Sequence, residues 1–484
     1  MKPFSRIFIP ILTGLVILSC EKNDPITDPN AKLAFSTDTV LFDTVFTTVG
    51  STTRNFRVYN TRALPIVIDR IALAQSPGSP FRLNMNGRAV NELEDVEIPG
   101  YDSIFIFVAV TLDPNGLNNP MVVQDSVVFE TNGNTQDVDL VAFGQDVHLI
   151  NGEILGTQRW INDKPYLVYN SMVVDSLNTL TIGPGTRIHF HKRSSMLVKG
   201  TLKVTGTLED PVWFQGDRLE HMYDSIPGQW GAWIEYGNGS TYILGGIHFL
   251  NGSLDNEIRH AVIKNGMKGI QVDTIANVSK PTLTLSNTRI ENMSVAGIYA
   301  QSSTIMASNC VIADCGLWCV ALTLGGSYEF YHCTISNHWG AARTEPAVIL
   351  NNYYVFEGTA YVYPLNNALF ANCIITGNRQ MEIGYENTIN NQPVPGTFNY
   401  FFDHCLARVD TLSTDDPEHW KALVKNLDPR FISQVHWDYR LDSLSPAQDK
   451  ADMHYSSYFP RDMLGNSRFS DKGPDIGAFE RVEK

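Results

Sequence analysis

The segment Asn309-Cys310-Val311-Ile312-Ala313-Asp314 recurs in altered form at four other places in the chain. Every copy begins with a polar residue, has isoleucine at its fourth position and ends with Asn, Asp or Gly. The other copies are 260–265 (HAVIKN), 287–292 (NTRIEN), 332–337 (HCTISN) and 372–377 (NCIITG). Their isoleucines are separated by 27, 22, 23 and 40 residues, so the segments form an internal repeat.

Intervals of 22 to 27 residues match one coil of a parallel β-helix. Each coil then places its isoleucine inside and stacks it on the same residue of the next coil, about 4.8 Å away. The 40-residue interval fits a coil with an insertion, roughly from Arg343 to Pro364. The polar ends of the repeats tolerate left-handed backbone and predict a ladder of hydrogen bonds at one bend. These residues are Asn265, Asn292, Asp314 and Asn337.

The cysteines follow the same repeat. Cys310, Cys333, Cys373 and Cys405 occupy equivalent positions, so we expect them to stack as small buried side chains and not to form disulfides. Cys315 and Cys319 lack a second cysteine pair or a histidine at ligand spacing. The sequence therefore predicts no metal site and no cofactor.

Residues 33–147 have a different pattern, of short strands with alternating apolar residues broken by turns. This pattern is typical of a β-sandwich. The segments at 66–68, 105–108, 127–132 and 138–144 resemble immunoglobulin-like domains of the ASH/MSP type. The resemblance implies a spacer or a protein-binding module.

Two further motifs belong to the long C-terminal part, residues 150–484. Residues 228–234 (GQWGAWI) resemble an element that opens many secreted β-helices. The segments 428–431 (DPRF), 438–441 (DYRL), 445–450 (SPAQDK) and 473–480 (GPDIGAFE) resemble the closing segment of right-handed β-helix proteins of the pectate-lyase superfamily type, except at Gln448, where that family has an apolar residue. The expected fold is therefore all-β, an Ig-like β-sandwich followed by a right-handed parallel β-helix.

The N-terminus resembles an export signal. Lys2 and Arg6 precede an apolar run, and Leu18-Ser19-Cys20 resembles a bacterial lipobox. The resemblance implies that residues 1–19 are removed, that Cys20 is lipidated and that 20–32 form a tether. Residues 21–24 (EKND) resemble the export signals of Bacteroidetes-type surface lipoproteins. We expect a protein anchored by lipid to the outer membrane and exposed at the cell surface.

The net charge of the chain limits which partners we expect. The formal net charge of -15 excludes nucleic acid as an expected partner. Lyases on this fold need a base with a bound cation, and glycosidases need paired carboxylates, but neither cluster repeats at coil spacing. The best catalytic candidates are His260, Lys264 and Arg289, for which a solvated face of the β-helix is the simpler explanation.

Aromatic residues crowd the middle coils and the insertion, where they favour sugar stacking or a protein interface. The expected binding residues are Trp339, Tyr353, Tyr354, Phe356, Tyr361 and Tyr363. We expect a non-catalytic binding or scaffolding protein, whose partner is a surface glycan or an outer-membrane β-barrel complex for import or barrel assembly. The alternative is a polysaccharide lyase or glycoside hydrolase acting on a surface glycan.

The motif Asp-Ser/Thr followed by an aliphatic residue occurs nine times and resembles the O-glycosylation motif of exported Bacteroidetes-type proteins. The expected acceptors are Thr39, Thr44, Ser103, Ser126, Ser176, Ser225, Thr274, Thr411 and Ser443. The alternative is that Asp-Ser/Thr simply opens strands.

Overall fold

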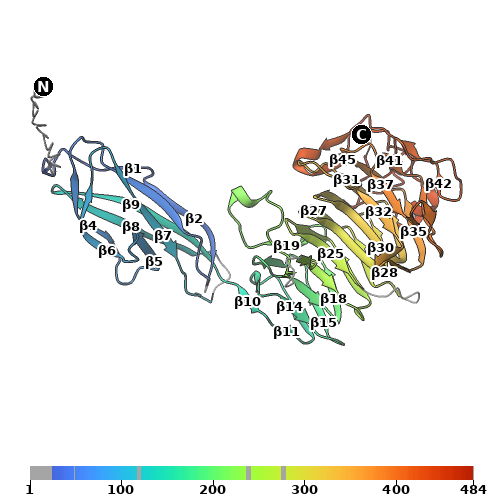
Figure 1. Cartoon of the computed structure of the whole chain (residues 1–484), viewed down its shortest axis with the longest axis horizontal. Coiled ribbons are helices and arrows are strands. Elements are labelled where there is room, and N and C mark those ends of the chain that lie inside the picture. The colour runs from blue at the N-terminus through green and yellow to red at the C-terminus, as the bar shows by residue number, and fades with distance from the viewer. Residues whose placement is uncertain (1–23, 48, 117–120, 236–240, 274–279, 483–484) are drawn as a thin grey trace, which may run out of the picture. The chain divides into compact units, whose positions relative to one another are not determined.

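The computed structural model of the chain describes residues 24–47, 49–116, 121–235, 241–273 and 280–482 (Figure 1). The expected lipobox, Cys20 and Thr274 lie outside these residues. The contacts divide the chain into two units between Gln145 and Asp146.

The first unit is a β-sandwich of two sheets, as expected from its alternating pattern. The four-stranded sheet has the order β1 (Ala34–Phe35), β3 (Arg54–Tyr59), β7 (Ser103–Val110) and β5 (Phe81–Met85). The five-stranded sheet has the order β2 (Thr39–Phe46), β9 (Asn134–Gln145), β8 (Met121–Thr131), β4 (Ile66–Leu73) and β6 (Glu92–Ile98). Their inner faces enclose a single cluster that includes Phe56, Phe81 and Phe129.

The second unit is a parallel β-helix whose coils contribute to two long sheets (Figure 1). We call the eleven-stranded sheet the short-strand sheet. Its strands, in order, are β10 (His148–Asn151), β13 (Tyr166–Tyr169), β16 (Arg187–Phe190), β19 (Val212–Gly216), β24 (Ala261–Lys264), β27 (Arg289–Met293), β29 (Val311–Cys315), β31 (Thr334–Asn337), β36 (Ile374–Gly377), β41 (Leu406–Ala407) and β43 (Val424–Lys425).

The seventeen-stranded sheet, here the bent sheet, holds two strand positions of each coil, which merge in the long strands β28 and β30. Its strands are β11 (Ile154–Leu155), β12 (Gln158–Trp160), β14 (Met172–Val174), β15 (Thr179–Ile182), β17 (Met196–Val198), β18 (Thr201–Thr205), β22 (Ile247–Phe249), β23 (Asn256–Arg259), β25 (Lys268–Val272), β26 (Leu283–Ser286), β28 (Ala296–Ser308), β30 (Trp318–Tyr331), β32 (Val348–Asn351), β35 (Leu365–Ala371), β37 (Ile383–Glu386), β40 (Phe401–Asp403) and β42 (Trp420–Lys421).

Smaller elements leave the coils. They are the hairpins β20 (Trp233–Glu235) with β21 (Thr241–Ile243), β33 (Tyr353–Phe356) with β34 (Thr359–Val362), β38 (Thr388–Ile389) with β39 (Gln392–Pro393), and β44 (Phe431–Ser433) with β45 (Asp438–Leu441). The short helices are η1 (His221–Tyr223), η2 (Gln434–His436) and α1 (Met453–Tyr458).

The register confirms the predicted isoleucine column. Ile263 pairs with Ile290, Ile290 with Ile312, Ile312 with Ile335 and Ile335 with Ile375, and all five are buried. Stacking like on like also builds a column of rings in the bent sheet. Successive centroids of Phe330, Phe370, Phe402 and Trp420 lie 4.8, 4.8 and 4.7 Å apart.

The six cysteines of the described residues are free thiols and are fully buried, as expected. In the Gly-x-Trp-Gly motif, Trp230 is buried, stacks on Phe190 and donates from its indole N–H to the carbonyl oxygen of Lys264 at 2.9 Å. A Cβ atom on Gly246 would lie 2.5 Å from this indole, which is why glycine stands there.

Left-handed residues flank the strands of the short-strand sheet at both ends. Asn265, Asn292 and Asp314 have positive φ, and Asn292 donates to the side chain of Asn265 at 2.8 Å, as the predicted ladder requires. Asn337 is not left-handed, but its side-chain oxygen accepts from the backbone N–H of Cys315 in the preceding coil at 3.1 Å. A second ladder precedes the strands, with φ between 47 and 55° at His260, Asn287, Asn309, His332, Asn372 and His404.

This second ladder holds the closing segment against the short-strand sheet. Asn372 exchanges hydrogen bonds with the backbone of Asp452 at 2.7 and 3.0 Å, and His332 pairs with Ser456 at 3.0 Å. Asn309 accepts from the buried guanidinium of Arg468 at 2.9 Å. Apolar residues of the segment then pack on the outer face of the sheet, in clusters that include Tyr439, Leu441, Met463, Ile476 and Phe479.

The insertion differs from the expected continuous loop between Arg343 and Pro364. Val348–Asn351 forms strand β32 of the bent sheet, and its apolar side chains are buried. Arg343 is also buried, in a two-pronged ion pair with Glu382 at 2.6 and 2.9 Å. Hairpin β33–β34 projects from this coil, whereas the residues before it occupy ordinary strand and core positions of the β-helix.

A buried acid in the closing segment makes the stability of the protein depend on pH. Burial raises the pKa of the Glu480 carboxyl to about 8, from the ordinary 4.5, beside Arg468 and Asp475. Because the pKa of Glu480 is higher in the folded than in the unfolded chain, its protonated form stabilises the fold. This contribution is complete below pH 4.5 and is lost as the pH rises to about 8. We expect the Tm of the wild type to fall by several degrees between pH 5 and 8, and less in Glu480→Gln, whose side chain stays neutral. Parallel Tm curves for the two proteins would contradict this assignment.

Candidate functional site

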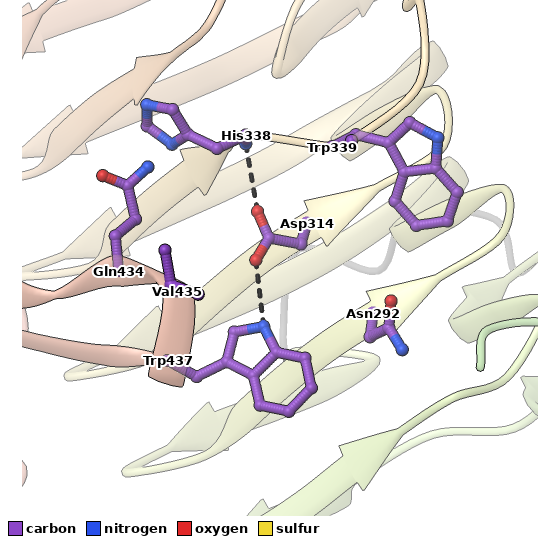
Figure 2. Close-up of a pocket in the computed structure, with 8 residues that line it drawn as sticks. Asn292, Asp314, His338, Trp339, Gln434, Val435 and Trp437 are labelled. Carbon is purple, nitrogen blue, oxygen red and sulfur yellow. Dashed lines mark hydrogen bonds between the residues drawn. The ribbon is translucent and has the colours of Figure 1, made fainter. Parts of the chain in front are cut away.

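An open groove lies where the closing segment meets the bend after the short-strand sheet (Figure 2). We call it the tryptophan groove. It encloses about 280 Å³, and its lining residues are Asn292, Asp314, His338, Trp339, Gly340, Gln434, Val435 and Trp437. Figure 2 shows Asp314 between the two indoles of Trp339 and Trp437. The groove thus combines two broad apolar rings with amide side chains.

Asp314 fixes the walls of the groove. One carboxylate oxygen accepts from the indole N–H of Trp437 at 2.9 Å and from the hydroxyl of Tyr439 at 3.2 Å. The other accepts from the backbone N–H of His338 at 3.0 Å. Burial raises the pKa of Asp314, against the lowering effect of these donors. The carboxylate therefore holds Trp437 in a fixed orientation, and its hydrogen-bonding capacity is largely used.

The remaining polar groups of the groove suit binding. Burial, aided by Arg343, lowers the pKa of His338 to about 4, so its imidazole is neutral near pH 7. The side-chain amide of Gln434 makes no hydrogen bond with the described part of the chain. Among its lining residues the groove holds one carboxylate, whereas glycoside hydrolysis ordinarily needs two. This arrangement supports ring stacking and hydrogen bonding better than acid–base catalysis.

The expected aromatic binding residues separate into two places. Trp339 lines the groove, while the others lie on or next to hairpin β33–β34. Tyr354, Tyr361 and Tyr363 stack in a row with centroids 5.0 and 6.2 Å apart. All three are exposed, and Phe356 at the tip is 57% exposed. Tyr353 instead fastens the hairpin, since its hydroxyl donates to the carbonyl oxygen of Thr388 at 2.8 Å.

The three catalytic candidates do not meet in one site. His260 and Arg289 line an apolar pocket of about 230 Å³, while Lys264 lines a separate polar pocket of about 240 Å³. Arg289 pairs with the buried Glu291 at 2.6 Å and donates to the carbonyl oxygen of Trp437 at 2.7 Å. Burial lowers the pKa of His260, whose ring accepts from Asn287 at 3.3 Å. Arg289 thus supports one wall of the tryptophan groove.

A cluster that the sequence analysis did not single out lies on the outer face of the bent sheet. Lys268 is 6% exposed, and burial lowers its pKa to about 8. It adjoins Gln271, Asp273 and the buried His248, in register across strands β22 and β25. His248 and Gln271 are 23 residues apart, so applying the coil spacing to polar residues would have found this pair.

The described acceptors of the O-glycosylation motif are all at least partly exposed: Thr39, Thr44, Ser103 and Ser126 are half-buried, and Ser176, Ser225, Thr411 and Ser443 are exposed. The aspartates of the motif also have a local structural role. The carboxylates of Asp102, Asp125 and Asp175 accept from the next backbone N–H at 2.7 to 2.8 Å, and strands β2 and β7 begin at the acceptor residue.

A family described as a right-handed β-helix region matches residues 245–396. These residues contain the isoleucine column and the middle strands of the bent sheet, from β22 to β37. The second unit of the chain is a right-handed parallel β-helix. No curated protein matches the sequence.

Solved structures show only distant similarity. The catalytic unit of a GH87 α-1,3-glucanase from Streptomyces thermodiastaticus is 9% identical, with a TM-score of 0.27 over 77% of this chain and 89% of the other. A family 123 glycoside hydrolase from Clostridium perfringens is 6% identical, with a TM-score of 0.19. The match covers 27% of this chain and 30% of that protein. The ASH/PapD-like domain of human CEP192 is 10% identical, with a TM-score of 0.17 over 25% of this chain and 91% of that domain. These values identify no activity.

Within the described ranges, no helix is long and apolar enough to cross a membrane. The same residues contain no group of three or more His, Cys, Asp or Glu side chains placed to hold a metal ion.

Deleting hairpin β33–β34 alone and deleting it together with strand β32 should have different effects on stability. Asn352 and Tyr363, which flank the hairpin, are joined by a backbone hydrogen bond of 2.7 Å, so a Gly-Ser bridge can replace 353–362 without disturbing the coil. We expect this variant to keep the Tm of the wild type within a few degrees. Deleting 348–363 also removes the buried Val348 and Leu350, and should lower stability by more than about 4 kcal/mol. Thermal unfolding of both variants tests this, and equal destabilisation would show that the hairpin belongs to the core.

Proposed function

We propose that the protein is a surface lipoprotein of the outer membrane whose β-helix binds a glycan in the tryptophan groove. The observation that carries the proposal is the pair of indoles, Trp339 and Trp437, facing one groove with amide groups beside them. Indole faces pack on the C–H faces of sugar rings, and a few fixed polar groups supply specificity.

The groove is prepared for binding before any ligand arrives. Asp314 accepts from the indole N–H of Trp437, and Arg289 donates to the carbonyl oxygen of Trp437. The side chain and the backbone of Trp437 therefore lose little freedom on binding. A preformed site of this kind gains affinity because the ordering cost is already met in the folded protein. The single carboxylate favours binding in this groove over hydrolysis.

A second candidate function is docking to an outer-membrane protein complex through hairpin β33–β34. The observation that supports docking is the exposed row of Tyr354, Tyr361 and Tyr363 with Phe356 at the tip of the hairpin. Aromatic side chains of this kind dominate protein interfaces. The 353–362 deletion separates the two candidates, because it should abolish docking and leave glycan binding unchanged.

The groove is tested by Trp437→Ala, assayed against a panel of immobilised neutral and acidic polysaccharides. We expect loss of about 2 kcal/mol, or roughly 30-fold in affinity, for any glycan that the wild type binds. Tyr458→Ala is the matched control, since this residue at the end of helix α1 is also aromatic, is 63% exposed and lies outside the groove. Unfolding curves check that Trp437→Ala remains folded. Equal affinities of the wild type and the Trp437 variant, or no glycan bound by the wild type, would refute the proposal.

The anchor is tested separately. Replacing Cys20 by alanine should abolish palmitate labelling and release the protein from the outer membrane, because the acyl chains supply the membrane affinity. Protease treatment of intact cells should digest the wild-type protein. Labelling that persists in the variant would disprove the anchor, and complete protection from protease would disprove surface exposure.

A further inference from the structure

Two cavities lie side by side on the outer face of the short-strand sheet, over strands β19 and β24. Side chains on this face alternate along each strand with the side chains of the core. Trp213 and Val262 pair in register and line the apolar pocket of about 230 Å³. Two residues further along the same strands, Gln215 and Lys264 line the polar pocket of about 240 Å³. The two pockets therefore share one face of one pair of strands.

The far wall of the polar pocket is the segment between β19 and β20, residues 218–229. Hydrogen bonds to the bend after the short-strand sheet fix this wall. The backbone N–H of Gln229 donates to the carbonyl oxygen of Asn265 at 2.8 Å, and the side chain of Asn265 donates to the carbonyl oxygen of Asp224 at 2.9 Å. Asn292 donates to the carbonyl oxygen of Ser225 at 2.9 Å. The pocket is thus already formed in the free protein, which lowers the ordering cost of binding.

The ammonium group of Lys264 carries a positive charge that has no partner within the described residues. Lys264 is half-buried, and its ammonium makes neither an ion pair nor a hydrogen bond with them. It lies 5.6 Å from the ring centre of Trp213, the residue that lines the adjoining pocket. A cation held in this way remains available to a ligand.

The carboxylates around the polar pocket each have a cation or a histidine of their own. Glu291 is in register with Lys264, but it is buried and directed to Arg289. The three pairs are Arg289–Glu291 at 2.6 Å, Arg218–Glu220 at 2.9 Å and His221–Asp224 at 3.0 Å. The charge of Lys264 is therefore not compensated by a contact within the pocket.

The other free polar group beside Lys264 is also a donor. The side-chain amide of Gln215 makes no hydrogen bond with the described residues. An ammonium and an amide N–H together match a group that only accepts hydrogen bonds and is negatively charged, such as a carboxylate or a sulfate ester. The indole of Trp213 next to them offers an apolar face of the kind on which sugar rings pack.

The polar pocket adjoins the tryptophan groove. Asn265 lines the pocket and Asn292 lines the groove, and their side chains are joined by a hydrogen bond of 2.8 Å. The two asparagines belong to successive coils, whose strands are about 4.8 Å apart. One oligosaccharide can therefore occupy both cavities.

We propose that the glycan bound in the tryptophan groove is anionic, and that Lys264 and Gln215 bind its carboxylate or sulfate group while a sugar ring packs on Trp213. This inference rests on the proposed function, since it names the class of glycan that the groove takes. The positive pocket adds a contact that a neutral glycan does not make. Carboxylates and sulfates present the same chemistry to Lys264, so the choice of polymers in the test distinguishes them.

The test measures affinity for polygalacturonate, alginate, κ-carrageenan and dextran sulfate, each compared with its carboxyl-reduced or desulfated form. The wild type should bind at least one acidic polymer about 10- to 100-fold more tightly than its uncharged form, as one hydrogen bond to a charged group provides. A preference for the first two polymers identifies a carboxylate, and a preference for the last two identifies a sulfate. Lys264→Met should abolish the preference and leave the affinity for the uncharged form unchanged. Lys264→Arg should restore most of it, because the positive charge is retained.

Lys199→Met is the matched control, since it removes the same charge from an exposed residue between β17 and β18, outside both pockets. It should keep the wild-type preference, which excludes non-specific attraction. Trp437→Ala should weaken the binding of charged and uncharged forms by the same factor, so it tests the groove separately. Equal wild-type affinities for charged and uncharged forms, or a preference that survives in folded Lys264→Met, would overturn the anionic pocket and leave the groove standing. Absence of binding to every polymer would overturn both.

Discussion

Hydrogen bonding between successive coils is the constraint on which the β-helix depends. Each strand of a parallel sheet satisfies its backbone groups only on its neighbours, and the register brings equivalent residues into contact. This is why Ile263, Ile290, Ile312, Ile335 and Ile375 form one column. The same constraint stacks rings, thiols and left-handed asparagines, so a single sequence position is repeated as a physical column through the molecule.

That repetition explains how much of the fold could be predicted from the sequence. The isoleucine column and the buried cysteines follow from a pattern that every central coil repeats. The earlier coils lack it: β16 and β19 pair in the same sheet through Ile188 and Phe214, but Gly185 and Pro211 stand where the central repeats begin with a polar residue. The strand β32 was predicted as loop because the aromatic hairpin beside it obscured the apolar alternation of Val348 and Leu350.

The candidate sites were less predictable because they join residues that the repeat does not relate. Trp437 reaches Asp314 from 123 positions away, carried by a closing segment whose path over the sheet no local pattern encodes. Arg289 was chosen for its charge, but tertiary contacts direct it to Glu291 and the backbone of Trp437. His248 and Gln271 are related by coil spacing, yet the hairpin whose Tyr242 hydroxyl accepts from Gln271 has no repeat equivalent.

The ring column of the bent sheet ends at Trp420, and this ending has a consequence for self-association. A stack of in-register parallel strands resembles a fibril cross-section, whose last strand offers unpaired backbone groups to any further chain. Here the last strands, Trp420–Lys421 and Val424–Lys425, are two residues long, and each carries a lysine. A second molecule approaching this end would find few backbone groups to pair with and would have to desolvate two ammonium groups. The stacking that builds the fold is therefore prevented from continuing into a polymer.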